Sequence, residues 1–156
     1  MLQLIKVKLC ERCNMANVFD VAKYILQKQG EMTTMKLQKL VYYSQAWSVV
    51  WDEKPLFNET IQAWASGPVV PDLYQKHKGQ YLISTLRCGD TQNLSEQEQE
   101  TVNAVLAHYG NKSAQWLSDL SHMEDPWNIA REGYNVGENC ENEISLSLLE
   151  EYYGSL

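Results

Sequence analysis

The chain has 156 residues, a formal net charge of −7 at neutral pH, 44% hydrophobic residues and 10% aromatic residues. This size and apolar content suffice for one hydrophobic core, which excludes global disorder and favours a single domain. The acidic balance disfavours a nucleic-acid partner, because binding phosphates needs a positive field, and it favours a basic partner.

The start of the chain does not resemble a targeting segment. Lys and Gln interrupt the apolar residues of the first ten positions, and no apolar run is long enough to cross a bilayer. We therefore expect a cytoplasmic protein that contacts no membrane and keeps its four cysteines reduced. Residues 1–14 are interpreted as an N-terminal extension, with Met15 as a candidate natural start, and residues 15–156 as the domain.

Two helices are predicted at the beginning of that domain. Asn17 and Asp20 have the spacing of a capping box, an apolar stripe at helical spacing follows them, and Gly30 predicts the end of the helix. A second helix is predicted from residue 33 or 34 to about Trp51. Because this segment is apolar over a wide arc, we expect the second helix to be central.

A short β-hairpin is predicted next, with the turn pair Asn58-Glu59 between residues 56–57 and 61–64. Residues 66–71 are predicted to form a turn that leads into a third helix. That helix is expected to end at Gly79, before a polar loop over residues 84–94.

The second half of the chain contains four further helix starts. They are Ser95 with Glu98 as a capping box, Ser113, Asp125-Pro126 and Ser145. The predicted fold class is therefore mainly α: a compact single-domain helical bundle with a small β-hairpin.

Metal and cofactor sites are not expected. Cys10 and Cys13 form a CxxC pair, but a structural zinc site needs four ligands, and Cys88 and Cys140 stand alone in the sequence. The three histidines do not show metal-ligand spacing, and glycine-rich phosphate loops and nucleophile motifs are missing from the sequence. A pairing of Cys88 with a distant histidine is not a specific signal.

One cluster could support acid–base chemistry: His122, Asp125 and Arg131, with Pro126 and Trp127 between them. The alternative interpretation is structural and is favoured. Asp125 would cap a helix that begins at Pro126, Trp127 would pack inward, and His122 or Arg131 would bond nearby carbonyls or carboxylates. We therefore expect a protein that is not an enzyme.

A second cluster lies on the central helix, where Lys36, Lys39 and Tyr43 share one face. This face is either a solvated basic strip or a docking face for an acidic or aromatic partner, and the sequence does not separate the two. A third cluster combines Gly67 and Pro68, which fix a tight corner between hairpin and helix. That corner could also form the edge of a binding groove.

Taken in order, several segments resemble the Panacea domain family, also called SocA-like or phage-associated GepA-like. The resemblance covers roughly residues 16–153, and its central motifs are long. The segments are Asn17–Leu26, Thr34–Trp47, Pro55–Phe57 with Ile61–Trp64, Gly67–Pro71, and His122 with Asp125-Pro126-Trp127 and Arg131.

The resemblance implies a largely helical fold with a small β element and neither an activity nor a cofactor. Many family members are antitoxins that neutralise a toxin by direct contact, and one relative is an adaptor that delivers its toxin to an ATP-dependent protease. The expected partner is therefore a cognate toxin. A protease partner, a homo-oligomer and a phage-encoded interaction role of another purpose stay open, and no nucleic acid is expected.

Two sets of residues follow from this reading. Candidates for partner binding are Lys36, Lys39, Tyr42, Tyr43, Trp47, Trp64 and Tyr74. Motif residues with an expected structural role are Leu37, Leu40, Gly67, Pro68, Pro71, His122, Asp125, Pro126, Trp127 and Arg131.

Overall fold

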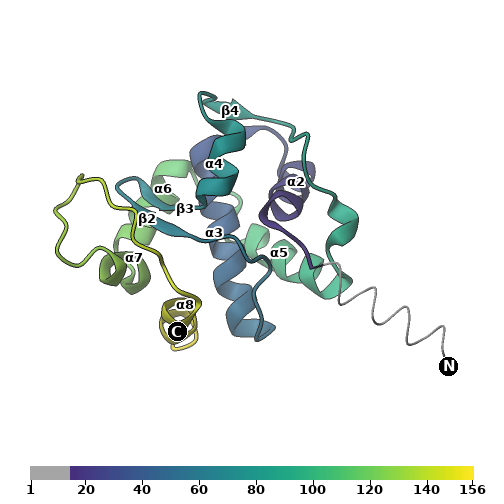
Figure 1. Cartoon of the computed structure of the whole chain (residues 1–156). Coiled ribbons are helices and arrows are strands. Elements are labelled where there is room, and N and C mark those ends of the chain that lie inside the picture. Colours follow the sequence, from purple (N-terminus) through teal and green to yellow (C-terminus); the bar gives the residue numbers. More distant parts are fainter. Residues whose placement is uncertain (1–14) are drawn as a thin grey trace.

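The longest helix, α3 (Thr34–Trp51), runs through the middle of the molecule (Figure 1). The computed structural model describes residues 15–156, so the predictions for the N-terminal extension and its CxxC pair lie outside the described residues. Helices α2 (Val18–Gln29) and α5 (Glu96–Tyr109) lie on one side of α3, and α6 (Ala114–His122), α7 (Asp125–Ala130) and α8 (Leu146–Tyr153) on the other. The fold is mainly α, as predicted.

Helix α3 is the core of this arrangement. It packs against α2, α5, α6 and α8, and 12 of its 18 residues are buried. Leu37 and Leu40 are fully buried, and the Thr33 hydroxyl caps the helix by accepting from the Lys36 amide at 3.1 Å. A helix covered on all sides must satisfy its polar side chains within the protein.

The predicted capping boxes are confirmed. Asn17 Oδ1 accepts from the Asp20 amide at 3.0 Å, and Asp20 Oδ2 accepts from the Asn17 amide at 2.9 Å. Gly30 ends the helix with φ of 79°. Ser95 and Glu98 form the second box at α5, and Ser113 and Ser145 cap α6 and α8. None of the described helices combines the length and apolar character that a bilayer crossing requires.

The β-hairpin exists, but its predicted position was wrong. β2 (Gln62–Trp64) pairs antiparallel with β3 (Gly67–Val69), so the turn lies at residues 65–66 and not at Asn58-Glu59. The segment at 56–57 pairs instead with the buried Gln45 side chain: Oε1 accepts from the Leu56 amide at 2.7 Å and Nε2 donates to the Phe57 carbonyl at 2.8 Å. A side-chain amide therefore takes the place of a strand partner.

Two further short elements complete the described chain. The sequence did not indicate the pairing of β1 (Met32–Thr33) with β4 (Leu82–Ile83), which ties the start of α3 to the segment after α4 (Pro71–His77). The 3-10 turn η1 (Thr91–Asn93) interrupts the predicted polar loop, and Asp20 anchors it by accepting from the Asp90 amide at 2.7 Å.

Gly67 is the point at which the hairpin touches α3. Its φ is 117°, and a Cβ placed there would lie 2.6 Å from Lys39 Cε and 3.1 Å from Ser121 Oγ. We expect Gly67→Ala to lower the free energy of unfolding by about 2–4 kcal/mol, because backbone strain adds to a steric clash. Urea unfolding measures the change.

Gly133 offers the matched control. Its φ is 89°, but a Cβ there would meet nothing within 4 Å, so Gly133→Ala isolates the cost of the backbone conformation. That cost should be about 1–2 kcal/mol. If Gly67→Ala and Gly133→Ala lower the free energy of unfolding equally, the close approach of the hairpin to α3 does not add to the cost of the Gly67 substitution.

Candidate functional site

The predicted docking face of α3 is not on the surface. Lys39 is 1% exposed, Tyr42 and Tyr43 are buried, and only Lys36 is partly accessible. Lys39 Nζ donates to the Pro68 carbonyl at 2.9 Å, and burial lowers the pKa of Lys39 to about 7. Because the hairpin and neighbouring helices cover this face of α3, the shared spacing of its residues did not produce exposure. The prediction that Lys39, Tyr42 and Tyr43 contact a partner is therefore corrected, because their side chains do not reach the surface.

Tyr43 belongs to a buried hydrogen-bonded group centred on Glu124. Glu124 Oε1 accepts from Tyr43 at 2.6 Å and from Tyr153 at 2.8 Å, and the hydroxyls of Tyr42 and Tyr153 lie 3.0 Å apart. Burial raises the pKa of Glu124, and the two tyrosine hydroxyls oppose that rise by stabilising the carboxylate. Helices α3, α7 and α8 meet at this carboxylate, which makes Glu124 a structural junction.

Arg131 is a second buried junction. Its guanidinium donates to the carbonyls of Ala63 at 2.8 Å, Asn135 at 2.9 Å and Glu138 at 2.7 Å. It also lies over the ring of Trp127, 4.9 Å from the centroid. Through these bonds Arg131 joins the β2 strand to the loop after α7.

Trp127 and His122 complete that junction. The Trp127 indole donates to the Trp64 carbonyl at 2.8 Å, and its ring stacks on His122 with centroids 4.1 Å apart. Burial lowers the pKa of His122, and its Nε2 is a buried nitrogen without a hydrogen-bond partner within residues 15–156. The predicted helix cap was wrong: Glu124 is the N-cap of α7, which begins at Asp125 rather than Pro126, and the N-cap makes no side-chain capping hydrogen bond.

Two glutamines of α3 were missed. Gln38 Oε1 accepts from the Val70 amide at 2.9 Å, its Nε2 lies 2.9 Å from His77 Nε2, and Gln45 binds the segment at 56–57. Burial lowers the pKa of His77. The signal was a glutamine within an apolar helix, since a buried amide must find partners. The sequence does not indicate which backbone it would meet.

The remaining predicted contact residues are half-buried and lie in two places. Trp64 and Tyr74 pack edge to face, with ring centroids 5.0 Å apart, beside the hairpin. Trp47 donates to the Tyr109 hydroxyl at 3.0 Å and stacks on Trp51, again at 5.0 Å. Lys36 donates to the Gly110 carbonyl at 2.7 Å, so it links α3 to the end of α5.

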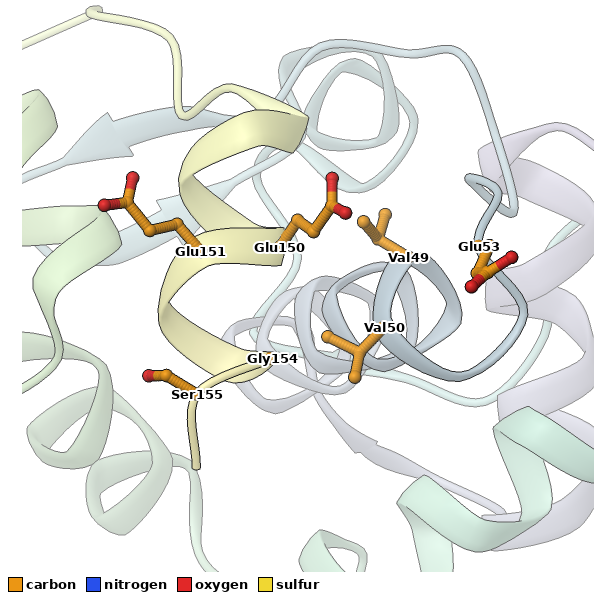
Figure 2. A pocket seen from close by; sticks show the side chains of 7 residues that line it. All are labelled: Val49, Val50, Glu53, Glu150, Glu151, Gly154 and Ser155. Atoms are coloured by element: carbon orange, nitrogen blue, oxygen red, sulfur yellow. The ribbon is translucent and has the colours of Figure 1, made fainter.

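The ends of α3 and α8 form an open hollow (Figure 2), which we call the α3–α8 notch. Its volume is about 400 Å³. Figure 2 shows Glu150 projecting from α8 toward Val49, with Glu53 beyond the end of α3 and Glu151 on the other side of α8. No pattern in the sequence indicates this surface. Its lining residues are Val49, Val50, Glu53, Glu150, Glu151, Gly154 and Ser155.

The described residues 15–156 contain no group of three or more His, Cys, Asp or Glu side chains placed to hold a metal ion. Cys88 and Cys140 are both free thiols, the first half-buried and the second buried. The polar groups of the predicted motifs are thus used to join helices, hairpin and loops. Together they hold the helices, the hairpin and the loops in one scaffold, and aromatic side chains such as Trp51, Tyr81 and Trp116 are exposed on its surface.

Comparison with known proteins identifies the family of this chain. Residues 37–128 match the family described as Antitoxin SocA-like, Panacea domain, and because the match spans more than half of the chain, the chain belongs to that family. Antitoxin SocA of Caulobacter vibrioides (strain NA1000 / CB15N) is 28% identical over 130 residues, which are 72% of this chain and 69% of that relative. No solved structure gives a significant match.

The matched segment contains much of the buried framework, but not α2, Arg131 or α8. It begins at Leu37 in α3 and ends in α7, so it includes Lys39, Gly67, Glu124 and Trp127. The α8 side of the notch lies beyond it. The α3 side of the notch therefore lies within the family match and the α8 side outside it.

Proposed function

We propose that this chain is an antitoxin that neutralises a toxin protein by binding it directly, without a catalytic step or a cofactor. Membership of the SocA-like antitoxin family is the observation that carries the proposal, and the similarity to Antitoxin SocA supports it. The net charge of −7 favours a partner with a basic surface.

The geometry of the His122 cluster supports a binding protein rather than an enzyme. Arg131 is 5% exposed and uses its guanidinium for three carbonyls, and Glu124 accepts from two tyrosines. Groups held in this way are not free to exchange protons with a substrate. The chemistry left on the surface is aromatic and acidic, which suits protein recognition.

Co-expression with the product of the neighbouring gene tests the proposal. We expect that product alone to arrest growth and this chain to restore it, with the two proteins recovered as a complex. His122→Gln should restore growth equally if its melting temperature is kept, because an imidazole is not needed for binding. Growth arrest that persists beside the wild-type chain would contradict the proposal.

The lifetime of the toxin separates neutralisation by binding from delivery to a protease. Direct neutralisation predicts that the toxin half-life is the same with and without the chain after translation is blocked. A half-life that this chain shortens, and that loss of one ATP-dependent protease restores, would identify an adaptor and overturn the binding mechanism.

A further inference from the structure

The α3–α8 notch combines an apolar floor with an acidic rim. Val49 and Val50 come from the last turn of α3, and the carboxylates of Glu53 and Glu150 lie on either side of them in Figure 2. Trp51, at the end of the same helix, is 50% exposed and stacks on Trp47. Tryptophan is enriched among the residues that contribute most of the binding energy at protein interfaces.

The notch carries three carboxylates, those of Glu53, Glu150 and Glu151. The sequence places one base, Lys54, beside Glu53. Carboxylates on both sides of an apolar floor attract a cation and disfavour an acidic partner.

We infer that the α3–α8 notch is a docking surface for an arginine side chain of a partner protein. The aliphatic stem would lie on Val49 and Val50, the guanidinium would reach Glu53 and Glu150, and an apolar neighbour of the arginine would pack on Trp51. Arginine fits better than lysine, because its planar cation binds carboxylates through two donors and stacks on tryptophan. The inference rests on the proposed function only for the identity of that partner as a toxin.

Other occupants fit less well. A second copy of this chain would bring another molecule of net charge −7 to an acidic rim. A metal ion would need its ligands within a few ångströms of one another, and within residues 15–156 these carboxylates do not form such a group. The size of the notch, about 400 Å³, admits a long side chain rather than a single ion.

Charge reversal at the notch tests the inference with the growth-arresting partner. Glu53→Lys with Glu150→Lys should weaken binding at least tenfold and remove growth rescue. The control is Glu31→Lys with Glu132→Lys, which changes the net charge equally at exposed positions outside the notch. This control variant should keep wild-type binding and growth rescue. Thermal unfolding of both variants excludes loss of the fold as the cause. Rescue by the notch variant equal to that of the wild type overturns the inference.

A defined peptide tests the notch without the toxin. We would titrate the ¹⁵N-labelled full chain with the peptide acetyl-Leu-Arg-Leu-amide, and with the same peptide carrying citrulline in place of arginine. The arginine peptide should shift the amide signals of Val49, Val50, Gly154 and Ser155 and the Trp51 indole signal, more strongly at low salt, and the citrulline peptide should not. No shift, or equal shifts with both peptides, contradicts the inference.

These outcomes separate the two proposals. Peptide shifts at the notch without growth rescue by the wild-type chain would refute the antitoxin proposal and support the docking surface. Growth rescue by the wild type that the notch variant keeps would support the antitoxin proposal and refute the docking surface.

Discussion

Replacing Arg131 by alanine is expected to lower the free energy of unfolding by about 3–5 kcal/mol. The side chain is 5% exposed, and its guanidinium donates to the carbonyls of Ala63, Asn135 and Glu138. Removing it leaves these carbonyls without their charged donor and removes the cation that lies over the Trp127 ring. Urea unfolding measures the loss.

Two controls define that result. Arg131→Lys should recover only part of the stability, because one ammonium group cannot reach three carbonyls that a planar fork spans. Arg87 is exposed, so Arg87→Ala should change the free energy of unfolding by no more than about 0.5 kcal/mol. If Arg131→Ala costs no more than Arg87→Ala, the guanidinium does not hold the hairpin to the loop.

Replacing Lys39 by methionine is expected to stabilise the protein at neutral pH and to change its dependence on pH. Burial lowers the pKa of Lys39 from 10.5 to about 7 in the folded state. Between these values the unfolded chain binds a proton that the folded chain does not, so stability rises with pH. The free-energy cost of protonating buried Lys39 is absent above pH 10.5. It grows as the pH falls through this window and is complete below about pH 7, so Lys39 lowers the free energy of unfolding most at low pH.

The size of this effect follows from the same shift. One pKa unit corresponds to about 1.4 kcal/mol, so the difference in unfolding free energy between Lys39→Met and the wild type should shrink by about 4 kcal/mol from pH 7 to pH 10. Loss of the hydrogen bond to the Pro68 carbonyl lowers the unfolding free energy of Lys39→Met by about 1 kcal/mol at every pH. Urea unfolding at pH 7, 8.5 and 10 measures the difference.

Lys76→Met is the matched control, because Lys76 is exposed on α4 and the net charge changes equally. Its difference from the wild type should stay nearly constant over the same range of pH. A Lys39→Met difference that is also independent of pH would show that Lys39 is not neutralised by burial.

Helix boundaries could be predicted from the sequence because their signals are local. Asn17 and Asp20, or Ser95 and Glu98, lie three residues apart, and each pair satisfies backbone amides of its own helix. The bounds of α3 follow similarly from the Thr33 cap and the apolar run. Such signals need no knowledge of the rest of the fold.

The hairpin and the basic face were misjudged because distant residues decide them. Phe57 is held by Gln45, and Lys39 is covered by the hairpin through Gly67 and Pro68. The α3–α8 notch likewise joins Val49 to Glu150, about one hundred positions later in the sequence. Helical spacing assigns a residue to a face of its helix, and tertiary packing alone determines whether that face is exposed.

Calorimetric titration of the purified chain with the growth-arresting product of the neighbouring gene tests neutralisation by direct contact most directly. Direct contact at the α3–α8 notch predicts saturable binding at a fixed stoichiometry, weakened at least tenfold by Glu53→Lys with Glu150→Lys and unchanged by Glu31→Lys with Glu132→Lys. Absence of binding by the wild-type chain, in a preparation whose partner still arrests growth, would contradict neutralisation by direct contact.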